Sequence, residues 1–78
     1  MKFKDEISLK GYLNQFIKRP YEFGILIHIG NYILFKVYPS TLLFETTPHK
    51  LQSLNDPDAR IIMWIRKLNN GEYLITEH

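Results

Sequence analysis

The chain of 78 residues contains no cysteine, so it can form neither a disulfide nor a metal site built on thiolates. Small extracellular domains commonly depend on disulfides, and we therefore expect a cytoplasmic protein. Apolar runs are too short for a membrane-spanning helix, and the start of the sequence lacks the apolar stretch of a signal peptide. The net charge of +2 is too small to indicate a nucleic-acid partner by itself.

Alanine is also scarce, since Ala59 is the one alanine in the sequence. Ile, Lys, Asn, Tyr and Phe, which have AT-rich codons, are abundant by comparison. This bias suggests a gene from a low-GC genome, its plasmid or its phage. The length favours one small globular domain over residues 1–78.

Patterns of catalytic or ligand-binding residues are lacking as well. The serines occur where turns and helix caps use a hydroxyl, and helix capping explains the two carboxylates that flank Pro57. The four glycines form no phosphate-binding loop. The three histidines, His28, His49 and His78, are not spaced as metal ligands. We therefore expect no catalytic residue, no metal site and no cofactor, and we interpret the chain as a protein that is not an enzyme.

The longest patterned stretch predicts three consecutive antiparallel strands. From Phe23 to Ile29, β-branched and aromatic residues recur at every second position, which is the period of a strand. Gly30-Asn31 suits a two-residue hairpin turn, so Tyr32 to Tyr38 is predicted as the second strand. Pro39-Ser40 indicates the next reversal, and Thr41 to Thr46 is predicted as the third strand.

A two-residue turn would fix the register of the first hairpin and thereby the two faces of the sheet. One face then carries Ile25, Ile27, Ile29, Tyr32, Leu34 and Lys36, and a tight second turn adds Leu43. The other face carries Leu26, His28, Ile33, Phe35, Val37, Leu42 and Phe44. Both faces are apolar, whereas an antiparallel sheet usually leaves a polar face to water. We expect both faces to be covered, by helices of this chain or by another molecule.

Helical periodicity predicts one helix on each side of these strands. Before them, the apolar positions share one side of a helix: Leu9, Tyr12, Leu13, Phe16 and Ile17. After them, Pro57 to Asn69 is predicted as a second helix, because Asp56 suits its N-cap and Asn70-Gly71 its C-cap. A last short strand is predicted for Glu72 to Thr76. The predicted fold is therefore α+β: an N-terminal helix, a three-stranded antiparallel meander, a second helix and a short C-terminal strand.

A rival interpretation remains open for the second helix. The segment Arg60 to Leu68 begins with strand-forming residues, and Asn69-Asn70-Gly71 also suits a hairpin turn. Arg60 to Leu68 and Glu72 to Thr76 would then be strands four and five. The rival fold is one helix with a small five-stranded barrel.

Both orders of elements resemble known families in outline. The order of one helix, three strands and a second helix is similar to the double-stranded RNA-binding domain, but Asp56 to Arg60 is acidic where that family has a basic cluster. The rival order resembles the Sm-like barrel of the bacterial RNA chaperone, without that family's glycine and acidic residue within Tyr32 to Phe44. Neither resemblance covers a motif, so no functional residue is taken from either family.

The doubly apolar sheet favours a non-catalytic protein-binding module. We expect a small regulator or inhibitor from a mobile element or phage, which binds a protein partner and also forms a homo-oligomer. The expected protein-binding residues are Ile25, Ile27, Leu34 and Leu43 on the sheet, with Met63 exposed on the second helix.

The alternative is a small nucleic-acid-binding protein that uses basic residues of the two helices: Lys10, Lys18, Arg19, Arg60, Arg66 and Lys67. A stacking platform for single-stranded nucleic acid would use aromatic rings beside bases, namely Tyr21, Tyr32 and Tyr38 with Lys36 and Lys50. Packing of these tyrosines at the rim of the core is favoured over that platform.

Overall fold

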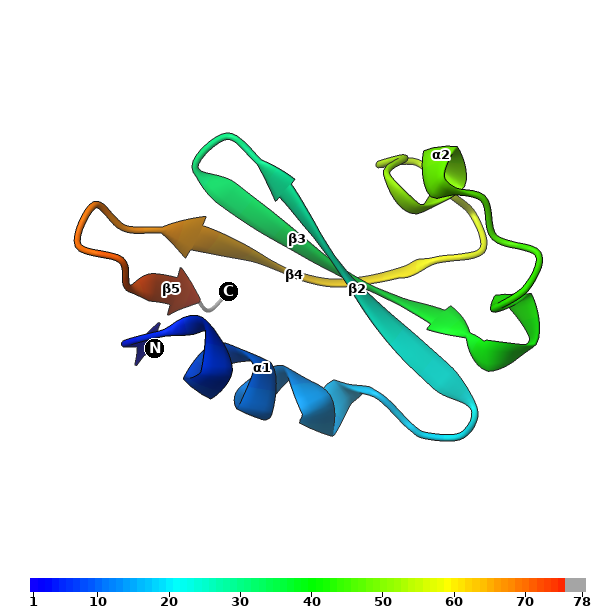
Figure 1. Ribbon diagram of the computed structural model, residues 1–78, viewed down its shortest axis with the longest axis horizontal. Helices are drawn as coiled ribbons and strands as arrows, with labels where there is room; N and C mark the ends of the chain where they lie inside the picture. Colours follow the sequence, from blue (N-terminus) through cyan, green and yellow to red (C-terminus); the bar gives the residue numbers. More distant parts are fainter. Residues whose placement is uncertain (76–78) are drawn as a thin grey trace.

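The computed structural model describes residues 1–75 and has an α+β fold (Figure 1). One open five-stranded antiparallel sheet has the strand order β1-β5-β4-β3-β2, so β1 and β2 are its edges. The strands are β1 (Lys2–Phe3), β2 (Glu22–Ile29), β3 (Tyr32–Pro39), β4 (Arg60–Lys67) and β5 (Tyr73–Ile75). The helices are α1 (Glu6–Leu13) and α2 (Pro48–Leu51), and 3₁₀ turns span Asn14–Phe16 and Ser40–Leu42.

The structure confirms the α+β class, the N-terminal helix, a three-stranded antiparallel meander (β2-β3-β4) and the short C-terminal strand. The register of the first hairpin is also as predicted, with Ile29 opposite Tyr32 and Ile27 opposite Leu34. Gly30 has a φ of 55° and Asn31 does not have a positive φ. This combination matches a type II′ turn, in which the first central residue is glycine.

The strand predicted for Thr41 to Thr46 is wrong. Ser40–Leu42 forms a 3₁₀ turn instead, and the Leu43 N–H donates to the Ser40 carbonyl at 3.0 Å. The carbonyl of Leu42 accepts from both the Thr46 N–H at 2.9 Å and the Thr46 hydroxyl at 2.6 Å. These local bonds occupy groups that a strand would offer to its neighbour, so the segment turns back on itself.

The helix predicted for Pro57 to Asn69 is also wrong, and the rival strand over Arg60 to Leu68 is the correct reading of that segment. Arg60–Lys67 is β4, the third strand of the meander. The Asp56 carboxylate accepts from the Asp58 N–H at 3.0 Å, so it forms a turn rather than a helix cap. The second helix is the short α2, whose N-cap Thr47 accepts from the Lys50 N–H at 3.2 Å.

Residues 1–75 do not form the rival barrel, because β1 and β2 do not pair with each other and remain the two edges of an open sheet. The fifth strand is β1, which the sequence analysis does not predict. Its two residues pair with Leu74 and Tyr73 of β5. Of the strand predicted for Glu72 to Thr76, Tyr73–Ile75 is confirmed and Thr76 lies outside the described residues.

The two faces of the sheet follow from the alternation of side chains along each strand. Helix α1 packs on one face, which we call the helix face (Figure 1). The core lies there and combines buried residues of α1 with those of the strands: Leu9, Leu13, Ile33, Phe35, Val37, Ile65 and Ile75. The opposite face, which we call the open face, is covered by the described residues at one end, where α2 and the loop after it contact β3. No helix within residues 1–75 has the length and hydropathy needed to cross a bilayer.

Candidate protein interface

A buried polar network holds α2 and its loop against one end of the open face. Lys36 and Tyr38 lie on this face in β3, and both are fully buried. The Lys36 ammonium donates to the Ser53 carbonyl at 2.7 Å and to the Tyr38 hydroxyl at 3.0 Å. Tyr38 has one hydroxyl proton, and Asp56 Oδ2 at 2.6 Å is a better acceptor for it than the Lys50 carbonyl at 3.3 Å. The network therefore connects β3 to Ser53 and Asp56 in the loop that follows α2.

The protonation of this network follows from its burial and its charges. Burial lowers the pKa of the Lys36 ammonium, and the negative charge of Asp56 opposes that shift. Burial also raises the pKa of the Tyr38 hydroxyl, as does its hydrogen bond to Asp56. Burial alone would raise the pKa of the Asp56 carboxyl, but the hydrogen bonds from Tyr38 and the Asp58 N–H, with the nearby Lys50 and Lys36, lower it overall. The network thus holds an ionised carboxylate beside a buried ammonium.

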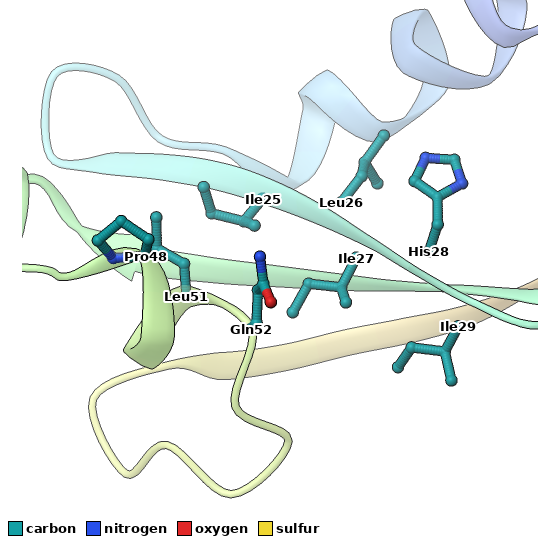
Figure 2. A pocket seen from close by; sticks show the side chains of 8 residues that line it. All are labelled: Ile25, Leu26, Ile27, His28, Ile29, Pro48, Leu51 and Gln52. Atoms are coloured by element: carbon teal, nitrogen blue, oxygen red, sulfur yellow. The ribbon is translucent and has the colours of Figure 1, made fainter.

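A groove of about 540 Å³ runs between the outer edge of β2 and α2 (Figure 2). Ile25 and Ile27 project from the open face of β2 toward α2, where Pro48, Leu51 and Gln52 form the opposite wall. Leu26 and His28 point to the other side of the strand. The groove therefore combines apolar side chains on both walls with the polar Gln52, and it follows the free edge of the sheet.

The far end of the open face is not covered by any part of residues 1–75 and carries an exposed apolar patch. We call it the open-face patch, and its residues are 37–45% exposed: Ile29, Tyr32 and Trp64. The rings of Tyr32 and Trp64 meet edge to face, with 6.3 Å between their centroids. Arg66, opposite Tyr32 in the β3–β4 register, lies on the same face. A half-exposed pair of large aromatic rings beside an arginine matches the composition of protein interfaces.

The five predicted protein-binding residues do not form one surface. Ile25 and Ile27 share a face with Leu34 as predicted, but Leu34 is fully buried. Leu43 is half exposed, yet it lies after the 3₁₀ turn and not on the sheet. Met63 is not on an exposed helix side, because it is opposite Phe35 in β4 and packs against the core. The prediction placed two residues, Leu43 and Met63, wrongly because it assigned their segments to the wrong elements.

Sequence reasoning also missed the two aromatic residues of the open-face patch, Tyr32 and Trp64. The sequence suggests Tyr32 only as a stacking residue, and Trp64 lies within the segment Pro57 to Asn69 that is predicted as a helix. Tyr38 and Lys36 were considered for that same platform, but both are buried and cannot stack on a ligand. The one available signal was the apolar character of both sheet faces, which indicated an excess of apolar surface without locating it.

The predicted basic residues lie in separate places. Arg60 makes two hydrogen bonds to the Glu22 carboxylate, at 2.8 and 3.0 Å, and Lys10 pairs with Glu6 at 3.6 Å. Arg60 and Lys67 are the two ends of β4, roughly 23 Å apart at 3.3 Å per residue. Lys18 lies with Arg60 beside one pocket, whereas Arg19 lies with Lys10 beside another. Nucleic-acid binding stays a prediction, and affinity that falls steeply with salt would support it.

In residues 1–75, no cluster of three His, Asp or Glu side chains has the arrangement of a metal site. His78 lies outside the described residues. Comparisons with protein-family models, with curated proteins and with solved structures give no match to this chain.

Proposed function

We propose that this chain is a non-catalytic protein-binding module whose contact surface is the open-face patch. The observation that supports the proposal best is the exposed Tyr32–Trp64 pair, because large aromatic side chains dominate the energetics of protein interfaces. Exposed apolar patches of this kind commonly mark interaction sites. The partner expected to cover it presents an apolar surface with an acidic group near Arg66.

The two ends of the open face differ in a way that favours a partner over further intramolecular packing. At one end, Lys36 and Tyr38 are bonded to the loop that covers them. At the other end, Tyr32 and Trp64 are 45% exposed. Covering that end with a partner would remove apolar area from water, and this stabilises a complex by roughly 25 cal/mol per Å² before the cost of association. The role we propose is that of a small regulator or inhibitor.

The proposal is tested by a photocrosslinking amino acid, p-benzoylphenylalanine, placed at Tyr32 and, as a matched control, at Ile7. Ile7 is an apolar residue of α1 that is 83% exposed, so it measures non-specific labelling. After irradiation in cells that carry the gene, the Tyr32 probe should give a defined adduct with another protein, and the Ile7 probe should not. Equal labelling from both positions would contradict the proposal, as would adducts with this chain alone.

A further inference from the structure

Strand β2 is a free edge whose backbone groups are available to another strand. Within residues 1–75, it pairs with β3 on one side and has no strand beside it on the other. Because Ile29 and Tyr32 close a two-residue turn, they form a hydrogen-bonded pair, and the odd-numbered residues of β2 bond to β3. The N–H and C=O groups of Gly24, Leu26 and His28 therefore point away from the sheet.

Apart from the charged Glu22 at its start, this edge has none of the features that usually prevent strands from pairing between molecules. Its eight residues, EFGILIHI, include no proline and no lysine. The one irregularity of the sheet is in the β3–β4 pairing, between Phe35 and Lys36, so β2 has no bulge. The other edge, β1, has only two residues. Long apolar edges without a bulge, a proline or a lysine are templates for a further strand.

We propose that the occupant of this edge is β2 of a second copy, paired antiparallel with Ile25 on the two-fold axis. In such a pair, residues whose N–H and C=O groups point outward must lie opposite each other. Near the middle of the strand, the two-fold axis can therefore pass through Gly24, Ile25 or Leu26. The register centred on Ile25 places Glu22 opposite His28 of the second copy, and Leu26 opposite Gly24. The imidazole can donate an N–H to the carboxylate, which Arg60 of the same chain also contacts.

The two neighbouring registers lack this complementarity. Centring the pair on Gly24 places the Glu22 carboxylate opposite Leu26. Centring it on Leu26 places His28 opposite Gly24 and leaves Glu22 opposite the hairpin glycine, Gly30. Only the Ile25 register pairs each polar side chain with a polar partner and uses the whole strand from Glu22 to His28.

This pairing would also close the groove along β2. Residues directly opposite each other in an antiparallel pair lie on the same face, so Phe23 and Ile27 of the two copies become neighbours on the open face. The groove walls include the apolar side chains of Ile25, Pro48 and Leu51 together with Gln52, and they border that same edge. Side chains of the second copy would enter the groove from its open side.

Single cysteines test the register directly, because the chain has no cysteine of its own. In Ile25→Cys the two thiols would lie on the axis in a non-hydrogen-bonded pair, with Cα atoms about 4.5 Å apart. In the control, Ile27→Cys, they would be about 13 Å apart, beyond the reach of a disulfide. Under mild oxidation, Ile25→Cys should form a covalent dimer at least about tenfold faster. Comparable rates for the two variants, or no dimer from either, would overturn the proposal.

A backbone change tests the pairing without a cysteine. His28→Pro removes an N–H that points away from β3, so the β2–β3 hairpin keeps its bonds. This variant should be a folded monomer by circular dichroism and light scattering, whereas wild type and His28→Thr, which keeps the N–H, should be dimers. A monomeric wild type, or a dimeric His28→Pro, would overturn the proposal. Neither result bears on the photocrosslink at Tyr32, so this proposal and the proposed function fail separately.

Discussion

Asp56 is the residue whose charge most directly fixes the shape of the open face. It accepts the Tyr38 hydroxyl proton and lies 3.9 Å from the Lys50 ammonium. Its side chain is 1% exposed. An ionised carboxylate removed from water in this way is stable only because each of its partners is in place.

The lowered pKa of Asp56 predicts a pH-dependent contribution to stability. Because the folded-state pKa is below the ordinary aspartate value, the contribution is complete above about pH 5 and is lost as the pH falls through the folded-state pKa. Asp56→Asn should therefore lower the free energy of unfolding at pH 7 and have much less effect near pH 2. Urea unfolding at the two pH values measures this. An equal effect at both would show that the charge of Asp56 is not what stabilises the loop.

Replacing Gly24 by alanine should disturb the packing of the core, and Gly11 provides the matched control. A Cβ at Gly24 would lie 2.7 Å from Ile17 Cδ1 and 2.8 Å from Phe35 Cε1, so the core would have to shift. Gly24→Ala should cost roughly 1 to 3 kcal/mol of unfolding free energy. Gly11, in α1, has no atom within 4 Å of such a Cβ, and Gly11→Ala should instead add roughly 0.5 to 1 kcal/mol. Chemical denaturation of both variants tests the comparison, and a Gly24→Ala variant as stable as wild type would refute it.

Among the elements, the β2–β3 hairpin could be predicted from the sequence because its signals are local. Period-two alternation and a glycine at the turn are enough to set its strands, its register and its faces. The residues of the groove wall, Ile25 and Ile27, were placed correctly for the same reason. The helix α1 was similarly predictable, since Leu9 and Leu13 follow its apolar side and Asp5 caps its start at 2.8 Å.

Strand β4 could not be predicted with the same certainty, because two periods fit its sequence. Ile61, Trp64 and Ile65 have helical spacing, yet they also form a strand with a bulge. The bulge changes the alternation, so both Ile61 and Trp64 lie on the open face. What decides between helix and strand is pairing with β3, and that pairing is not encoded locally. The position of the open-face patch also depends on which end of that face the loop after α2 covers. The hydrogen bond from Lys36 to Ser53 holds the loop there, and these residues are 17 apart in the sequence.

The assignment of Trp64 to a strand changes what its removal should do. If Trp64 were a core residue of a helix, its replacement by alanine would cost roughly 3 to 5 kcal/mol of unfolding free energy. On the open face it is 45% exposed, so Trp64→Ala should cost less than about 2 kcal/mol. Phe35→Ala, in the core beneath α1, should cost the larger amount. Unfolding followed by circular dichroism measures both, and equal losses would place Trp64 in a core.

The dimensions of the whole molecule agree with a sheet that extends beyond its cover. The radius of gyration is 12.8 Å and the extents are 37 × 24 × 23 Å. A compact chain of this length would have a radius of about 11.5 Å. The excess reflects a twisted sheet with one helix on one face and a short helix over part of the other (Figure 1). At this scale we propose a protein partner for the uncovered end of the sheet and a second copy for its free edge.

The yield of the Tyr32 photoadduct in a Trp64→Ala background tests the central claim most directly. Loss of a central aromatic contact typically costs 2 kcal/mol or more, so affinity for the partner should fall by about 30-fold and the adduct should nearly disappear. Ile7→Ala, on the opposite face, should leave the yield unchanged. An undiminished adduct in a folded Trp64→Ala protein would contradict the account, because the open-face patch would then not hold the partner.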